Sequence, residues 1–438
     1  MKKMGLAFLV LLAFVNFTVF AGGGGDKGAK AQTQDSKVVL QVFHYFGQAS
    51  KLKGLNDVEA AFSKQYPNVS FENLYYNNGA DYYQQLATAL ASGEQPNLIM
   101  GQPAVFPDVI ANGYAMDLRN NQVLKDLNLP QGDLNDASAN KILYAFPIDY
   151  KGNVVLYNID IYEKLGLQVP TKKSELLDNL KKIKAAGIDP WIQCYSDMVF
   201  DNVEVTATLW PRIKAAGDFD FYENLMSGKK KVTDYPYFIE ALNNWTERIK
   251  GYTRMDSISN NQDKMLELFV SGQSAMIYTG SWNIGDVLDK SAGKNFRFGS
   301  FLMPIDENPS TPKMVVNLDQ VFMVNPKAKN ADIALKFMEF WMTDGAAPWS
   351  EATALPLTSG RISDKAHQTV KDLAATKKAG NIVHNGDFTM PFNAEFNTLY
   401  RRNLLSYAES IVSGGNMTPA QCLANMQTAF DTARSTSK

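Results

Sequence analysis

Short apolar runs alternate with amphipathic segments near the start of the chain, and this alternation restricts the folds that the chain can adopt. Residues 38–43 have the sequence VVLQVF, and similar runs follow at 69–75 and 96–100. Segments with helical spacing of apolar residues, 55–65 and 82–91, separate these runs. Strands that alternate with helices pair in parallel, because each helix returns the chain to the same end of the sheet. The pattern predicts an α/β fold with a mostly parallel, wound sheet.

A second informative stretch, residues 266–286, has the sequence LELFVSGQSAMIYTGSWNIGD. Its first part has an apolar face at helical spacing, and residues 274–278 predict a buried strand. A new helix is expected to begin after Gly280, so Trp282 lies just beyond the carboxyl end of a strand. Ligands bind at that edge in open α/β sheets, which makes Trp282 a candidate for a ligand contact. The alternative is that Trp282 is a tryptophan of the core.

The order of helix, glycine turn, strand and Gly-Ser-Trp in this stretch closely resembles the signature of extracellular solute-binding proteins of family 1. These are the sugar-binding components of ABC importers and include the maltose-binding proteins. The resemblance covers nearly the whole chain after Ser36, and 438 residues are enough for two domains. It implies the two-lobe periplasmic binding protein fold of type II, with helices on both faces of the sheets and hinge crossings between the lobes. The expected boundaries are 37–147 and 316–345 for lobe 1, and 148–315 and 346–438 for lobe 2.

The first 36 residues are typical of an exported protein. Lys2 and Lys3 precede an apolar run at 5–20, and Ala21 ends an acceptable cleavage site, so residues 1–21 are predicted to be a signal peptide. Residues 22–36 are rich in Gly, Lys, Ala and Gln and are expected to form a flexible tether. Many members of the family carry a lipidated cysteine at the cleavage point, and this sequence has none there. We therefore expect a periplasmic or extracytoplasmic protein without a lipid anchor.

Composition argues against several other classes of function. The chain has 43 Lys and Arg against 45 Asp and Glu, so no basic excess indicates nucleic acid binding. Its two cysteines, Cys194 and Cys422, are expected to be buried thiols, although one disulfide is possible in an exported protein. The three histidines have neither metal-site nor triad spacing, so no metal, cofactor or catalytic residue is predicted. An exported glycoside hydrolase would need two carboxylates, and Asp149 and Asp319 could face each other, but no motif requires it.

A carbohydrate presents apolar faces, which aromatic rings can cover, and a rim of hydroxyl groups, which carboxylates and amides can bind. Loops after strands and at the crossings supply both kinds of residue. We rank Trp282 first, followed by Asp149 and Trp349. The candidate aromatic platforms are Tyr45, Tyr150, Trp191, Trp282 and Trp349. The candidate partners for the hydroxyl rim are His44, Asn78, Asp81, Gln102, Asp149, Gln193, Asn317 and Asp319.

The resemblance implies a monomer that binds a mono- or oligosaccharide between its lobes, closes by hinge motion and delivers the ligand to the membrane subunits of an ABC permease. Other solutes remain open, namely polyamines, glycerol phosphate and peptides. A phosphate ligand would require convergent Arg or Lys, and the candidate set is short of Arg. A polyamine would require several carboxylates, and Asp81, Asp149 and Asp319 keep that alternative open.

Overall fold

The computed structural model describes residues 37–76, 79–197, 200–388 and 392–436. Residues 37–438 form one compact unit. The predicted signal peptide, the predicted tether and Asn78 lie outside the described residues. Within the described ranges, no helix combines the length and the apolar character that crossing a membrane requires.

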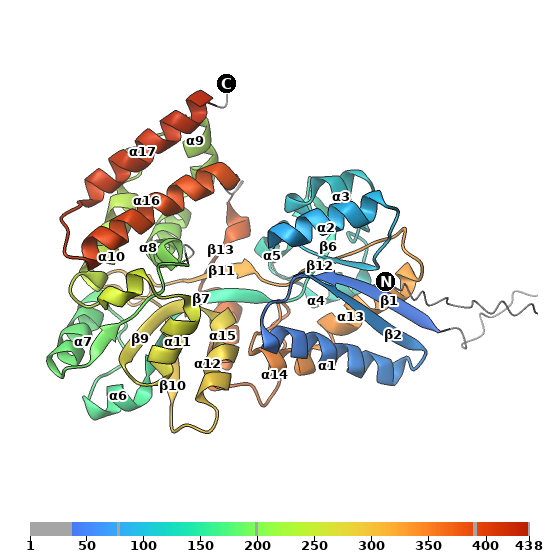
Figure 1. The fold of residues 1–438 in the computed structure, drawn as a ribbon, viewed down its shortest axis with the longest axis horizontal. Coiled ribbons are helices and arrows are strands. Elements are labelled where there is room, and N and C mark those ends of the chain that lie inside the picture. The colour runs from blue at the N-terminus through green and yellow to red at the C-terminus, as the bar shows by residue number, and fades with distance from the viewer. Residues whose placement is uncertain (1–36, 77–78, 198–199, 389–391, 437–438) are drawn as a thin grey trace, which may run out of the picture. The chain divides into compact units, whose positions relative to one another are not determined.

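The first sheet has the strand order β2-β1-β3-β12-β6 (Figure 1). β1 pairs in parallel with β2 and β3, as the strand–helix alternation predicts. β12 arrives from much later in the chain and pairs antiparallel with both β3 and β6. The strand bounds are β1 (Val38–His44), β2 (Val69–Tyr75), β3 (Leu98–Met100), β6 (Ala145–Pro147) and β12 (Val321–Val324). 

We call this sheet and the helices that pack on it the first group of elements. The helices cover the sheet because each has one apolar face. Phe62 of α1 and Phe337 of α13 meet at 5.2 Å between ring centroids, and both are fully buried. The helices are α1 (Ala49–Gln65), α2 (Gly79–Ala91), α3 (Pro107–Ala111), α4 (Gln122–Leu127), α5 (Gln131–Asp136), α13 (Ala331–Met342) and α14 (Ala346–Thr353), with the 3-10 turn η1 (Pro103–Val105) and the small hairpin β4 (Ser138–Ala139) and β5 (Ile142–Leu143).

The second sheet has the order β13-β11-β7-β9-β8, and β10 also pairs with β7. β7 is antiparallel to β9, β10 and β11, whereas β8 is parallel to β9 and β13 is parallel to β11. The predicted α/β class is confirmed, but the strand directions are mixed, because strands that enter directly from the other sheet need no helical crossover. The bounds are β7 (Tyr150–Asn158), β8 (Asp189–Trp191), β9 (Ser274–Gly280), β10 (Phe298–Phe301), β11 (Met314–Leu318) and β13 (Ile382–His384).

We call the second sheet and its helices the second group of elements. Among these helices, α8, α10, α16 and α17 gather on one side of the sheet (Figure 1). Cys194 and Cys422 are both buried and unpaired. The helices are α6 (Ile159–Lys164), α7 (Lys173–Ala185), α8 (Phe200–Ala216), α9 (Phe221–Ser227), α10 (Pro236–Ile249), α11 (Gln262–Val270), α12 (Ile284–Ser291), α15 (Gln368–Lys378), α16 (Ala394–Val412) and α17 (Pro419–Thr436). The 3-10 turns are η2 (Val232–Asp234), η3 (Met255–Ile258), η4 (Ser281–Asn283) and η5 (Asn385–Asp387).

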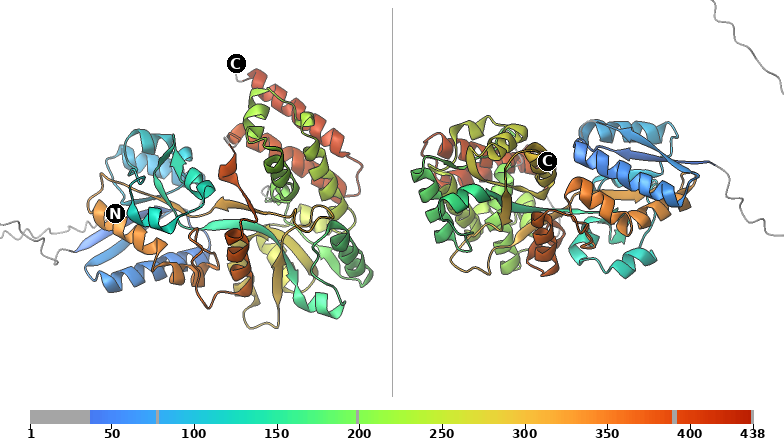
Figure 2. Two further views of the ribbon diagram at one scale, coloured as in Figure 1. Left: turned by 180° about the vertical axis from the view of Figure 1, so that it is seen from behind. Right: turned by 90° about the horizontal axis from the view of Figure 1, so that it is seen from below.

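Three extended crossings connect the two groups of elements (Figure 2). They run from β6 to β7, from β11 to β12 and from α14 towards Thr358. The backbone N–H of Ile148 donates to the carbonyl of Gln320 at 2.9 Å, and the N–H of Thr358 donates to the carbonyl of Ile148 at 3.0 Å. The crossings therefore lie side by side and are hydrogen-bonded to one another.

The helices α1 and α14 approach closely at Gly54. A Cβ atom there would lie 2.8 Å from Cε3 of Trp349 and 2.8 Å from Cγ2 of Thr353. We expect Gly54→Ala to lower the free energy of unfolding by about 1–2 kcal/mol, because overpacking outweighs the helix propensity that alanine adds. Urea denaturation measures the change, and Ala60→Gly at an exposed position of α1 measures the propensity contribution. An unchanged or higher stability of Gly54→Ala would show that the helices can separate at little cost.

Candidate functional site

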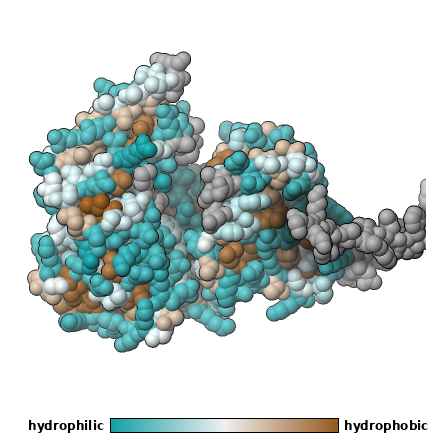
Figure 3. All heavy atoms as spheres, viewed as in Figure 1, coloured by the Kyte–Doolittle hydropathy of each residue, from teal (hydrophilic) through white to brown (hydrophobic). Residues whose placement is uncertain are grey.

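Two adjoining cavities of about 600 Å³ each lie between the two groups of elements, beside the crossings. We call them together the cleft. Figure 3 shows a hollow at this place, with mainly hydrophilic residues inside it. The volume is suitable for a small solute. The two cavities share the lining residues Gln48, Lys51, Gln102, Lys151, Leu318 and Asp319.

The wall from the first group is built by loops that follow parallel strands, where ligand sites are expected. Tyr45 and Gln102 follow β1 and β3, and Tyr83 projects from α2 with 40% of its surface exposed. Gly101 has a φ of +139°, and a Cβ atom there would lie 2.0 Å from the ring of Phe106. Glycine is thus required for the chain to turn into the cleft at this point.

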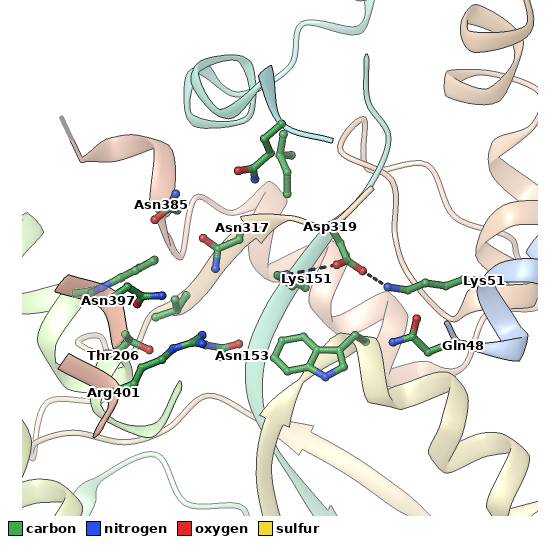
Figure 4. A pocket seen from close by; sticks show the side chains of 15 residues that line it. Gln48, Lys51, Lys151, Asn153, Thr206, Asn317, Asp319, Asn385, Asn397 and Arg401 are labelled. Carbon is green, nitrogen blue, oxygen red and sulfur yellow. Dashed lines mark hydrogen bonds and ion pairs between the residues drawn. The ribbon is translucent and has the colours of Figure 1, made fainter. Parts of the chain in front are cut away.

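The wall from the second group carries two tryptophans, several amides and an arginine (Figure 4). These side chains come from β7, β11, α8, η4, η5 and α16, elements that are distant in the sequence but line the same cavity. The residues are Asn153, Thr206, Trp210, Trp282, Asn317, Asn385, Asn397 and Arg401.

The Gly-Ser-Trp sequence fixes the position of the Trp282 ring. A Cβ atom on Gly280 would lie 1.6 Å from the ring of Trp282, so the ring lies directly against this residue. The indole N–H donates to the amide oxygen of Gln262 at 3.3 Å, and the ammonium group of Lys151 lies 5.7 Å from the ring centroid. The ring is held in a fixed orientation at the edge of the cleft, as a platform for an apolar ligand face would have to be.

An ion-pair cluster forms the floor of the cleft. The ammonium groups of Lys51 and Lys151 lie 2.7 Å and 3.4 Å from the Asp319 carboxylate, and Lys51 is almost fully buried (Figure 4). Burial alone would raise the pKa of Asp319, but the two lysines outweigh it and lower the pKa to about 2. The side-chain amide of Gln320 also donates to this carboxylate, at 2.6 Å. Asp319 is therefore ionised and already bound by three donors.

Asp149 lies within the crossings and has no exposed surface. Its Oδ1 accepts the backbone N–H of Gln320 and its Oδ2 accepts the indole N–H of Trp349, both at 2.8 Å. Burial and the nearby Asp319 charge raise the pKa of Asp149 to about 7. The carboxyl group thus joins two crossings to α14.

The raised pKa of Asp149 predicts a specific pH dependence. The folded protein holds this proton between about pH 4 and pH 7 while the unfolded chain releases it, so this group makes the protein less stable as the pH rises through that range. In Asp149→Asn the effect is absent. The difference in the free energy of unfolding, variant minus wild type, should therefore become more positive by about 1–3 kcal/mol from pH 5 to pH 8. Urea denaturation of both proteins at the two pH values measures this change. Asp126→Asn at an exposed position is the control, and parallel pH profiles for Asp149→Asn and wild type would contradict the assignment.

Five of the residues predicted from sequence line the cleft, and their role in binding stays a prediction. They are Tyr45, Gln102, Trp282, Asn317 and Asp319. Asn78 and the side chain of Asp81 lie outside the described residues.

Six predicted residues do not reach the cleft and are fully buried instead, so the structure corrects their expected position. The indole of Trp191 donates to Glu204 at 3.1 Å, and the amide of Gln193 donates to the carbonyl of Tyr278 at 3.0 Å. His44, Tyr150 and Trp191 lie in strands, and strand side chains alternate between two faces, so a place near a strand end does not determine which side a residue faces. The six are His44, Asp149, Tyr150, Trp191, Gln193 and Trp349.

Sequence reasoning missed most of the charged and amide side chains of the cleft. Lys151 and Asn153 lie in and just after the Asp-Tyr-Lys-Gly segment, which had indicated the crossing itself. Asn397 and Arg401 are four residues apart on α16 and therefore share one helix face. That spacing was the available signal, but spacing alone does not show which face of a helix is turned towards a ligand.

A sequence profile of the family described as bacterial extracellular solute-binding protein matches residues 49–348. The chain belongs to this family. It is accordingly a solute-binding protein and not an enzyme, and the family predicted from sequence is confirmed. Among the described residues, no cluster of His, Cys, Asp and Glu could hold a metal ion.

Curated relatives and solved structures agree with this membership. The melibiose/raffinose/stachyose-binding protein MelE of Bacillus subtilis is 22% identical over 352 residues, which cover 78% of this chain and 79% of MelE. The sn-glycerol-3-phosphate-binding protein UgpB of Brucella abortus is 26% identical over 171 residues, which cover 36% of this chain and 35% of UgpB. The apo structure of RafE from Streptococcus pneumoniae matches with a TM-score of 0.72 at 18% identity, covering 92% of this chain and 99% of RafE. The last match establishes the same fold.

Proposed function

We propose that this solute-binding protein binds a carbohydrate in the cleft and serves as the extracytoplasmic binding component of an ABC importer. The observation that carries the proposal is the fixed Trp282 ring on one wall, with Tyr45 and Tyr83 on the other and amides between them. Rings can cover the apolar faces of a sugar while amides bind its hydroxyl groups. The relationship to MelE, whose name describes an oligosaccharide-binding protein, supports the same ligand class.

The crossings suggest how binding would be coupled to transport. The elements around each sheet would form one lobe, and rotation about the three crossings would bring the two walls together. A ligand that contacts both walls stabilises the closed form by its higher affinity for that form. The closed form would then dock on the permease as a monomer. In this proposal residues 1–21 direct export and residues 22–36 are a tether.

The structure favours neither a hydrolase nor a polyamine-binding protein. Asp149 is buried with both of its oxygens bonded, and Asp319 is bound by two lysines and an amide. Neither carboxyl group is free to act as a general acid or a nucleophile. Of the carboxylates of the polyamine hypothesis, Asp319 lines the cleft and Asp149 is buried within the crossings. The side chain of Asp81 lies outside the described residues.

A thermal-shift screen with mono-, di- and oligosaccharides tests the proposal. A saccharide at about 100 times its Kd should add roughly 2.7 kcal/mol to the stability. Trp282→Ala should then weaken the affinity by roughly 30-fold or more, because it removes the aromatic platform, and Trp282→Phe should weaken it less. Phe219→Ala, an exposed aromatic outside the cleft lining, is the matched control. The proposal fails if no saccharide stabilises the protein, or if the saccharide that does so binds Trp282→Ala as tightly as the wild type.

A further inference from the structure

Arg401 reaches the cleft from α16 and has no ion-pair partner among the described residues. Figure 4 shows its side chain extending into the cavity towards Asn153. The Nε of Arg401 is buried and has no hydrogen-bond partner in the described part of the chain. A guanidinium group keeps its charge in a protein, and a buried donor without an acceptor is costly. An unpaired arginine at this place indicates that its acceptor arrives with the ligand.

The cavity that Arg401 lines contains several amides, one threonine and, among the described residues, a single carboxylate, Asp319. Asn153, Asn317, Asn385 and Asn397 line the same cavity. The described lining of the whole cleft has three cationic side chains and a single carboxylate, Asp319, whereas the protein as a whole carries a net charge of −2. The positive charge is thus local to the cleft.

The single carboxylate of the lining does not neutralise Arg401. Asp319 is engaged by Lys51 at 2.7 Å and by Lys151 at 3.4 Å, so its charge is shared between these two cations. Asp149 lies behind the cleft surface, and both of its oxygens accept hydrogen bonds from the protein. The arginine therefore remains available to an anion that enters from solvent.

We propose that the ligand is an acidic saccharide whose oxyanion, a carboxylate or a phosphate, pairs with Arg401. This inference rests on the proposed carbohydrate function and specifies its substrate class. The guanidinium group can bind either oxyanion through two parallel N–H···O bonds, and neighbouring asparagine amides can donate to the remaining oxygens. The neutral rings of the ligand would lie towards Trp282. The candidate set from sequence was short of arginine, and Arg401 is an addition to it.

Titration calorimetry with matched sugars tests this inference. The probes are oligogalacturonides, neutral galactose oligosaccharides of equal length, and the sugar phosphate glucose 1-phosphate. Wild-type protein should bind one of the acidic probes at least ten-fold more tightly than the neutral one, and the preference should decrease with salt. Preference for the galacturonide assigns a carboxylate ligand, and preference for the sugar phosphate assigns a phosphate ligand.

Variants at two adjacent arginines separate a direct contact from a general charge effect. Arg401→Gln should lower the affinity for the acidic probe at least 30-fold and change the affinity for the neutral probe less than three-fold. Arg401→Lys should restore part of the loss, because it keeps the charge but not the paired donors. Arg402→Gln, at the exposed neighbouring position, should leave both affinities unchanged.

The outcomes distinguish the two proposals. Equal or tighter binding of the neutral probe, or equal losses for both probes in Arg401→Gln, would overturn the acidic ligand while the carbohydrate function stands. Absence of binding by every probe here and by every sugar of the thermal-shift screen would overturn the carbohydrate function, and the acidic ligand with it.

Discussion

Asp133→Ala is expected to lower the free energy of unfolding by about 3–5 kcal/mol, because it leaves a buried charge without its partner. Asp133 belongs to α5 and has no exposed surface. Its carboxylate lies 2.5 Å from the ammonium group of Lys377 and 2.7 Å from Nε2 of His384. The Lys377 side chain is 5% exposed, and its ammonium group lies 4.0 Å from the centroid of the Tyr150 ring. Without Asp133, this cation has no described counter-ion in direct contact.

A double-mutant cycle distinguishes loss of the charge pair from simple loss of packing. Urea denaturation of Asp133→Ala, Lys377→Met and the double variant gives the coupling energy. We expect the double variant to be more stable than Asp133→Ala alone, because it no longer contains the unpaired cation. Strictly additive losses would show that the ion pair does not account for the effect.

This cluster also connects the two groups of elements. Asp133 lies beside the first sheet, whereas Lys377 and His384 belong to α15 and β13 of the second group. The side-chain amide of Asn135 bonds the carbonyl of Gly386 at 3.0 Å across the same junction. The cluster therefore holds the ends of the crossings in place, and its loss should also weaken ligand binding.

Glu204→Ala is expected to lower the free energy of unfolding by a similar amount, about 3–5 kcal/mol, because several buried donors share this one acceptor. Glu204 belongs to α8 and is fully buried. Its carboxylate accepts the indole N–H groups of Trp191 and Trp245, at 3.1 and 2.7 Å, and the hydroxyl of Tyr195 at 2.6 Å. Each donor left unpaired costs about 1–3 kcal/mol.

Glu204→Gln is the matched control, because glutamine has a similar shape and keeps one acceptor oxygen. It should lose less stability than Glu204→Ala in urea denaturation. Tryptophan fluorescence should change in both variants, since two indoles contact this side chain. A stability loss in Glu204→Gln equal to that in Glu204→Ala would indicate that the negative charge, rather than the hydrogen bonds, is what matters. Thr206 and Trp210, on the same helix, line the cleft, so ligand affinity is expected to decrease as well.

The sequence predicted those parts of the fold whose signals are local. The alternation at 38–100 correctly indicated β1 to β3 and the helices between them. The Gly-Ser-Trp sequence placed Trp282 at a strand end, and its ring lines the cleft. In both cases the signal lies in the residue pattern of the segment itself. For Trp282 the contact is local as well, because its ring lies against Gly280, two residues earlier.

The remaining features depend on contacts that no local signal encodes. Trp349 and Trp282 are both tryptophans near a chain crossing or strand end, but Trp349 is buried against Gly54 of α1, 295 residues earlier in the chain. Arg401 belongs to a helix with ordinary amphipathic spacing, and its place in the cleft depends on how α16 packs on α8. Pairing of β12 between β3 and β6 likewise depends on the complete chain.

The position of β12 has a consequence for how the chain folds. β12 lies in the interior of the first sheet, between β3 and the edge strand β6. β6 therefore joins the other strands only through β12. The sheet therefore closes only after Val324 is available, although its first strand begins at Val38. Strand pairs so distant in sequence form slowly. In a nascent chain that ends before Val324, β3 and β6 would remain unjoined. A chain that completes its first sheet this late would remain competent for passage across a membrane in an unfolded form.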